Sequence, residues 1–184
     1  MQQFWIFGYG SLMWNPGFDY EACEPARIGG LHRSLCVKSF VHRGTPERPG
    51  LVLGLDRGGS CRGLAFRIAA GKWEQTLSYL REREQVTMVY LEQRRYINLL
   101  ERRTKVEAVT YVVDRAHQQY AGVLKLPELI ALVQQGEGVS GHCRDYVVNT
   151  VTHLREMKIH DARLEKLVGE IQYQTSASSP CAAS

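Results

Sequence analysis

The order in which strand and helix patterns follow one another constrains the fold of this chain most. Runs of β-branched and aromatic residues predict strands at 4–7, 30–38, 50–55, 61–68, 95–100 and 106–113. Gly58-Gly59-Ser60 predicts a turn before the strand at 61–68. Helical spacing of apolar residues predicts helices at 71–84, 127–135, 144–157 and 161–174. Strands in a run followed by helices in a run are typical of an α+β fold and not of a βαβ sheet. We therefore expect an α+β protein with a small mixed or antiparallel β-barrel and flanking helices.

The length of the chain favours one domain with one substantial core. The chain has 184 residues, of which 44% are hydrophobic, and contains no internal linker. We expect a single domain over residues 1–174. Residues 175–184 are small and polar, which predicts a flexible C-terminal tail that includes an unpaired Cys181.

Charge and cysteine usage narrow the class of protein. The 23 Lys and Arg residues against 19 Asp and Glu are spread thinly along the chain, which gives nucleic-acid binding little support. No apolar run is long enough to span a membrane. Five scattered cysteines, without a C-x-x-C pair or a secretory apolar segment, indicate a reducing cytoplasm. The six dispersed histidines give no recognisable zinc spacing, so we expect no metal. The oligomeric state does not follow from the sequence.

The first predicted strand runs directly into Gly8-Tyr9-Gly10-Ser11, which predicts a binding site. Closely spaced glycines at the end of a strand free backbone N–H groups from sheet pairing and suit a small anion such as a carboxylate. A dinucleotide fingerprint would need a third glycine where Met13 stands. Ser11 lacks the G-x-S-x-G context of a nucleophile, so we expect its hydroxyl to donate a hydrogen bond.

Three further segments combine glycine, proline and charge. Residues 42–50 form a loop rich in glycine and proline that presents cations, and residues 79–84 end the first predicted helix with alternating charges. Residues 138–146 begin a helix after two hinge glycines.

With these segments, the chain resembles the ChaC-like γ-glutamylcyclotransferase family. That family carries Phe-Gly-Tyr-Gly-Ser-Leu, a His-Arg-Gly-x-Pro-x-x-Pro-Gly loop, an Arg-Glu pair and a Gly-x-x-Gly helix start, in the order seen here from Phe7, His42, Arg83 and Gly138. The resemblance covers roughly residues 4–170. It implies a β-barrel with flanking helices and a cytosolic lyase that cleaves glutathione into 5-oxoproline and cysteinylglycine without a metal or an organic cofactor.

The resemblance also implies a set of site residues. The catalytic glutamate of the family falls on Glu84, which we assign as general acid and base. The substrate-binding loop of the family falls on Ile6, Phe7, Gly8, Tyr9, Gly10, Ser11 and Leu12. Arg43 and Tyr146 complete the predicted substrate-binding residues.

Several roles stay open at this point. The ring of Tyr9 either touches the γ-glutamyl group or packs the barrel, and Arg43 either meets the carboxylate of the substrate or braces its loop. Glu82 is the nearest rival base, but it lies on a nearly opposite face of the helix from Glu84. Arg81 is three residues before Glu84, and we expect it to point elsewhere, because a close guanidinium would lower the pKa of the base.

Three functional hypotheses follow. The favoured one is a glutathione-specific γ-glutamylcyclotransferase. The second is a cyclotransferase for other γ-glutamyl amides or amino acids, and the third is a non-catalytic small-molecule sensor on the same scaffold.

The chain departs from the family pattern at the start of the helix after Gly141. Family members carry Asn where this chain has Cys143, and a longer acid where it has Asp145.

Overall fold

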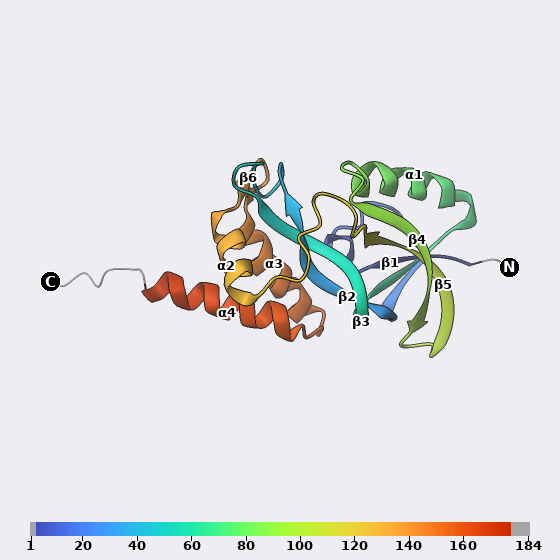
Figure 1. Ribbon diagram of the computed structural model, residues 1–184. Coiled ribbons are helices and arrows are strands. Elements are labelled where there is room, and N and C mark those ends of the chain that lie inside the picture. Colours follow the sequence, from blue (N-terminus) through green and yellow to red (C-terminus); the bar gives the residue numbers. More distant parts are fainter. Residues whose placement is uncertain (1–2, 178–184) are drawn as a thin grey trace. The chain divides into compact units, whose positions relative to one another are not determined.

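The computed structural model describes residues 3–177, and the side chains of residues 3–174 (Figure 1). The chain forms two compact units. The first, here called the barrel unit, runs to Val37 and again from Leu53 to Gly122. The second, here called the helical unit, consists of Lys38–Val52 and the chain from Val123 onward. The expectation of a single domain over residues 1–174 stays a prediction, and the predicted tail lies mostly outside the described residues.

Five strands close into a barrel in the order β1-β3-β2-β4-β5. Their bounds are Phe4–Gly8, Ala22–Ser39, Gly50–Ile68, Tyr90–Leu99 and Thr104–Val113 for β1 to β5. The pairs β1–β3, β2–β4 and β4–β5 are antiparallel, whereas β1 and β5 are parallel, with Ile6 opposite Val109. The barrel is therefore mixed and leaves no open sheet edge between β1 and β5. The predicted α+β class with a small mixed barrel is confirmed.

Helix α1 (Trp73–Glu84) lies against the outside of the barrel (Figure 1). It follows the short 3-10 helix η2 (Ala70–Lys72). Its buried side chains Trp73, Leu77 and Leu80 recur at helical spacing and share a core cluster with barrel residues such as Phe66. This packing fixes the C-terminal end of α1, where Glu84 is the last helical residue.

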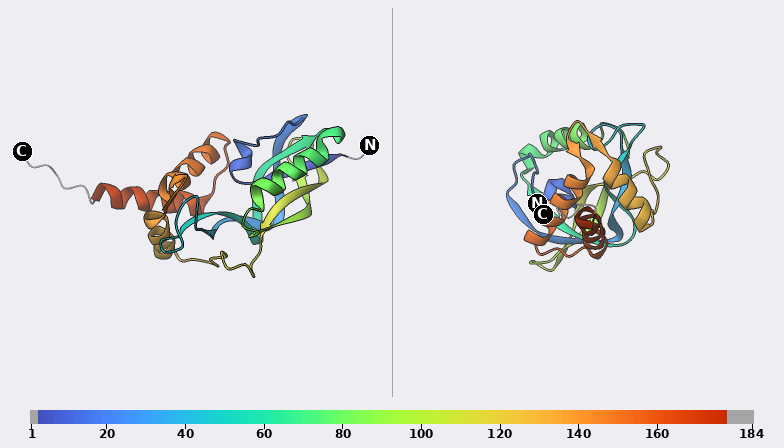
Figure 2. Two further views of the ribbon diagram at one scale, coloured as in Figure 1. Left: turned by 90° about the horizontal axis from the view of Figure 1, so that it is seen from above. Right: turned by 90° about the vertical axis from the view of Figure 1, so that its left-hand side faces the viewer.

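The helical unit contains α2 (Leu126–Gln135), α3 (Cys143–Glu156) and α4 (Ala162–Ala177). The three helices pack on one another in both views of Figure 2. A two-stranded hairpin of β6 (Glu137–Gly138) and β7 (Gly141–His142) joins α2 to α3. The predicted helices at 127–135, 144–157 and 161–174 are confirmed, with ends that differ by a few residues.

The predicted turn at residues 58–60 is wrong, because β3 continues through it as one strand. Gly58 and Gly59 have φ of +104° and +66°, and no atom lies within 4 Å of a Cβ built on Gly58. Gly30 in β2 has φ of +75°, and β2 likewise begins earlier than predicted, at Ala22. Long strands that curl into a barrel need local bends, and glycine supplies them without ending the strand.

Candidate active site at the end of helix α1

The apolar side chains of the segment from Ile6 to Leu12 are buried, so a ligand could reach its backbone but not those side chains. Ile6, Phe7 and Leu12 are at most 6% exposed and belong to the barrel core, and the Tyr9 side chain is only 8% exposed. Burial of Tyr9 supports packing in the barrel as its role. After β1 ends at Gly8, the chain turns into the 3-10 helix η1 (Ser11–Met13).

Hydrogen bonds occupy the carbonyl groups of this turn. The Tyr9 carbonyl accepts from Arg33 Nε at 2.6 Å, the Gly10 carbonyl from Met13 N at 2.9 Å, and the Ser11 carbonyl from Asn15 N at 2.8 Å. Within residues 3–177, the N–H groups of Gly10 and Ser11 have no hydrogen-bond partner. The turn therefore presents donors with its acceptors already engaged, which is an arrangement suited to an anion.

Gly10 leaves open space beside these donors. Its backbone has φ of −131° and ψ of −135°. A Cβ built on Gly10 meets only Leu53 Cδ1, at 3.6 Å. By contrast, a Cβ on Gly8 would lie 3.2 Å from Leu12 Cβ, so Gly8 allows close packing within the barrel unit.

Glu84 is a half-buried carboxylate with one charged partner. Its side chain is 19% exposed, and Arg83 Nε lies 3.3 Å from Glu84 Oε1. No other hydrogen bond or ion pair reaches this carboxylate from the described part of the chain. Burial raises the pKa of Glu84 above its ordinary value, and the charge of Arg83 opposes that rise without cancelling it. A carboxylate with a raised pKa is suited to accept and return a proton near neutral pH.

Arg83 connects Glu84 to the glycine turn, a link that the sequence analysis missed. Its Nη1 donates to the carbonyls of Asn15 at 2.7 Å and Pro16 at 3.2 Å, and its Nη2 donates to Ser11 Oγ at 3.1 Å. One side chain thus contacts both the catalytic candidate and the predicted binding turn. The Arg-Glu pair was visible in the sequence, but nothing in the spacing indicated these tertiary contacts.

Arg81 and Glu82, the other charged residues at this end of α1, have partners other than Glu84. Arg81 makes a bidentate pair with Glu92 through Nε and Nη2, each at 2.8 Å, so the expectation that Arg81 points elsewhere is confirmed. Tyr111 also donates to Glu92, at 3.2 Å. Glu82 is exposed on the helix surface near Ser78, which removes it as a rival base.

Arg43 and Tyr146 lie in the helical unit and contact each other. The guanidinium of Arg43 stands 5.3 Å from the centre of the Tyr146 ring, a cation–π arrangement. Arg43 also donates to the carbonyls of Ser140 and His142. Arg43 therefore braces its loop, while contact of either residue with substrate stays a prediction.

The side chain of Cys143 makes two contacts with the backbone of β3. The buried thiol donates to the Leu51 carbonyl at 3.1 Å and accepts from Leu51 N at 3.2 Å. Burial raises the pKa of this thiol, which keeps it protonated and able to donate. Cys143 thus supplies one donor and one acceptor to the backbone of β3, as an amide side chain would.

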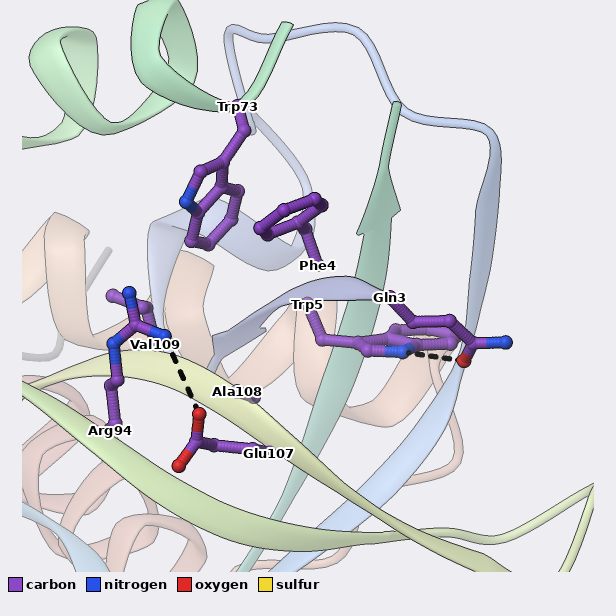
Figure 3. Close-up of a pocket in the computed structure, with 8 residues that line it drawn as sticks. All are labelled: Gln3, Phe4, Trp5, Trp73, Arg94, Glu107, Ala108 and Val109. Carbon is purple, nitrogen blue, oxygen red and sulfur yellow. Dashed lines mark hydrogen bonds and ion pairs between the residues drawn. The ribbon is translucent and has the colours of Figure 1, made fainter. Parts of the chain in front are cut away.

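A cavity of about 160 Å³ opens elsewhere in the barrel unit (Figure 3). The stacked rings of Phe4 and Trp73 form one wall, and the ion pair of Arg94 with Glu107 forms another. None of the predicted site residues lines this cavity. In the described residues, no group of three His, Cys, Asp or Glu side chains is placed to hold a metal ion. Likewise, no described helix is both long and apolar enough to cross a membrane.

Comparison with known proteins places the chain in a family. Residues 4–174 match the family described as ChaC-like protein. A glutathione-specific gamma-glutamylcyclotransferase of Escherichia coli (strain K12) is 31% identical over 176 residues, which covers 96% of this chain and 76% of the relative. Glutathione-specific gamma-glutamylcyclotransferase 1 of Danio rerio is 33% identical over 156 residues, covering 82% and 79%.

The fold has a solved counterpart. The crystal structure of a selenomethionine-labelled gamma-glutamyl cyclotransferase specific to glutathione, from yeast, matches with a TM-score of 0.83 at 21% identity. The match covers 94% of this chain and 97% of the yeast chain, and it shows that the two share a fold. Together with the match over residues 4–174, these relatives show that the chain belongs to the ChaC-like protein family.

Proposed function

We propose that the protein is a glutathione-specific γ-glutamylcyclotransferase that converts glutathione into 5-oxoproline and cysteinylglycine. The observation that carries this proposal is the half-buried Glu84, whose raised pKa suits a base and whose neighbour Arg83 reaches the donor-rich turn at Ser11. The relatives from Escherichia coli and Danio rerio carry the name of this activity.

The reaction needs little covalent help from the protein. The α-amine of the γ-glutamyl group attacks its own γ-carbonyl carbon, a five-membered lactam closes, and the amide bond to the cysteine nitrogen breaks. Nucleophile and electrophile belong to one molecule, and well-oriented intramolecular reactions reach effective molarities on the order of 10⁵ M or more. The protein must therefore hold the substrate curled and move protons.

Glu84 is the group proposed to move them. The α-amine enters as an ammonium ion and becomes nucleophilic only when a base takes its proton. Glu84 would accept that proton and return it to the departing amide nitrogen, and it would carry the second proton that the attacking nitrogen sheds as the lactam closes to the same leaving nitrogen, so that no proton is gained or lost over the cycle. The same carboxylate serves both transfers, which agrees with its link through Arg83 to the Ser11 turn.

The turn at Gly10 and Ser11 is proposed to hold the γ-glutamyl end. Its two N–H groups have no partner among the described residues, and the Cβ position of Gly10 beside them meets only Leu53 Cδ1, so the α-carboxylate of a γ-glutamyl substrate would find donors there. Arg43 and Tyr146 are proposed as further substrate contacts, and within the helical unit they contact each other.

The cytoplasm is the proposed compartment. Cys23, Cys36, Cys61 and Cys143 are all free thiols. Free thiols persist in reducing compartments, where glutathione is also kept in its thiol form.

The test is to incubate the purified protein separately with glutathione, γ-Glu-Ala and γ-Glu-ε-Lys and to measure 5-oxoproline by mass spectrometry. Release from glutathione alone supports the proposal. Release from the other amides in preference to glutathione would favour a cyclotransferase of different specificity. Absence of 5-oxoproline with all three, together with measurable binding of glutathione, would indicate a sensor.

A further inference from the structure

Arg83 makes more polar contacts than its position on a helix surface requires. Its side chain is 22% exposed, and its donors reach both the segment of residues 11–16 and acceptors on its own helix. Nη1 contacts the carbonyls of Asn15 and Pro16 and the hydroxyl of Tyr79, and Nη2 contacts Ser11 Oγ. Nε faces Glu84. All three guanidinium nitrogens are thus engaged.

The bond to Ser11 has a chemical consequence. A serine hydroxyl has one O–H donor and two acceptor lone pairs. Arg83 has no acceptor, so its bond fixes the Ser11 oxygen as the accepting partner. Because the described chain offers the hydroxyl hydrogen of Ser11 no acceptor, that hydrogen is available beside the N–H groups of Gly10 and Ser11.

The bonds to Asn15 and Pro16 hold the segment that follows. Residues 11–16 leave the barrel as η1 and a short irregular stretch, tied to each other by the bonds of Trp14 N and Asn15 N to the Ser11 carbonyl. Arg83 fastens the far end of this stretch to the same helix end that carries Glu84.

We propose that Arg83 is a positioning residue, which fixes the Ser11 hydroxyl as a donor to the substrate and fastens residues 11–16 beside the helix end that carries Glu84. This inference rests on the proposed cyclotransferase reaction. The planar fork of arginine is required for it, because the ammonium of lysine is a point charge that cannot serve all of these acceptors at once.

The charge of Arg83 has a second, separable effect. The groups around Glu84 are Arg83 on its own helix and Tyr111 from β5, whose phenol interacts with the Glu84 charge. Behind Tyr111 stands Glu92 from β4, already paired with Arg81. Arg83 is therefore the cation that lowers the pKa of Glu84 against the effect of burial. Removing its charge raises that pKa further and moves the acid limb of activity to higher pH.

Two substitutions distinguish the effect of the planar guanidinium group of Arg83 from the effect of its positive charge. Arg83→Lys keeps the positive charge but loses a charge-assisted hydrogen bond. We therefore expect the KM for glutathione to rise roughly ten-fold. The acid limb of the pH profile of kcat/KM should stay in place, because the charge beside Glu84 is kept. Arg83→Gln removes the charge as well and should also shift that limb to higher pH. Arg81→Lys is the matched control on the same helix and should change the KM less than two-fold.

A double-mutant cycle tests the link to Ser11. Ser11→Ala and Arg83→Lys each remove part of one hydrogen-bonded unit, so the double variant should lose less than the product of the two single losses in kcat/KM. Multiplicative losses would show that Arg83 does not act through the Ser11 hydroxyl.

Hydrogen exchange supplies a readout that does not depend on turnover. In Arg83→Lys, amides in the peptide covering residues 11–16 should exchange roughly ten-fold faster, while peptides from β5 stay unchanged. Unchanged exchange and an unchanged KM in Arg83→Lys would overturn the inference, and this variant decides alone if Arg83→Gln does not fold. If the wild-type protein releases no 5-oxoproline, the proposed function is wrong. If the wild-type protein turns over glutathione and the Arg83 variants show no change in KM or exchange, only the inference about Arg83 is wrong.

Discussion

Two carboxylates of the barrel unit, Glu84 and Asp56, are both withdrawn from solvent but have opposite environments. Asp56 is 1% exposed and accepts three hydrogen bonds, from Arg115 Nε at 2.7 Å, Tyr120 Oη at 2.8 Å and Arg57 N at 2.7 Å. Glu84 is 19% exposed and has a single ion pair at 3.3 Å. Burial disfavours the charged form of both groups.

The number of hydrogen-bond donors around each carboxylate decides whether its pKa is raised or lowered. At Asp56, burial pushes the pKa upward, but the bonds from Arg115, Tyr120 and Arg57 outweigh it, so the pKa lies below its ordinary value. At Glu84, one partner does not outweigh burial, and the pKa is raised. A satisfied carboxylate holds structure together, whereas an unsatisfied one is able to exchange a proton near neutral pH.

The largest expected effect is the loss of turnover in Glu84→Gln. The amide cannot take the ammonium proton, so 5-oxoproline release from glutathione should fall by at least about two orders of magnitude while the fold is kept. Glu82→Gln is the matched control, since this exposed acid lies two residues away, and it should retain turnover within about two-fold. Near-normal turnover in Glu84→Gln would show that Glu84 is not the base of the reaction.

Asp56→Ala should instead affect stability. The substitution leaves Arg115 and the Tyr120 hydroxyl without their acceptor and should lower the free energy of unfolding by about 3 kcal/mol. Urea denaturation measures the loss, and the folded fraction should turn over glutathione within a few-fold of wild type. A stable Asp56→Ala protein with greatly reduced turnover would reverse the roles assigned to the two carboxylates.

Gly10→Val separates binding from proton transfer. There is room for the new side chain, because a Cβ built on Gly10 meets only Leu53 Cδ1, and circular dichroism checks that the fold is kept. The branched side chain would block approach to the N–H groups of the turn, so the KM for glutathione should rise at least about ten-fold. A normal KM would mean that the ligand binds elsewhere.

The pH dependence of stability should differ between the two sites. Because the folded-state pKa of Asp56 is depressed, its contribution is present above the unfolded value, near 3.8, and is lost as the pH falls through the folded value. Asp56→Asn should therefore flatten the loss of stability on acidification. Thermal unfolding between about pH 2 and pH 6 measures this, and an unchanged slope would contradict the depressed pKa.

The smallest expected effect is a gain of stability in Glu84→Gln. A raised pKa means that stability is fully present below the unfolded value, near 4.5, and is lost as the pH rises through the folded value. At neutral pH the charged Glu84 is therefore a cost, and glutamine should leave stability unchanged or raise it by up to about 1 kcal/mol. A clear loss in urea denaturation would show that the pair with Arg83 outweighs burial.

The sequence predicted the elements of the fold but not the environments of these acids. Apolar spacing at Trp73, Leu77 and Leu80 predicts α1, because a helix with one buried face leaves a local signature. The turn at residues 58–60 was predicted wrongly, because glycines that bend a long strand have the same composition as glycines that end one. Closure of the barrel, which decides between the two, depends on pairing between distant strands.

The candidate site also has one part that the sequence predicted and one part that it did not. Gly10 and Ser11 stand in a local glycine motif, whereas Glu84 was named through the resemblance to the family. The contacts of Arg83 with Asn15 and Ser11 span about 70 positions, and Asp56 meets Arg115 across 59 positions, so no local pattern encodes them. The degree of burial that sets each pKa also arises only in the folded chain.

The most direct test is an NMR titration of the wild-type protein with ¹³C-labelled Asp and Glu carboxyl groups, in which Glu84→Gln and Asp56→Asn assign the two signals. The account predicts that Glu84 titrates above 4.5 and Asp56 below 3.8. A Glu84 midpoint at or below 4.5 would contradict the account, because the group proposed to carry the proton would then be an ordinary surface acid.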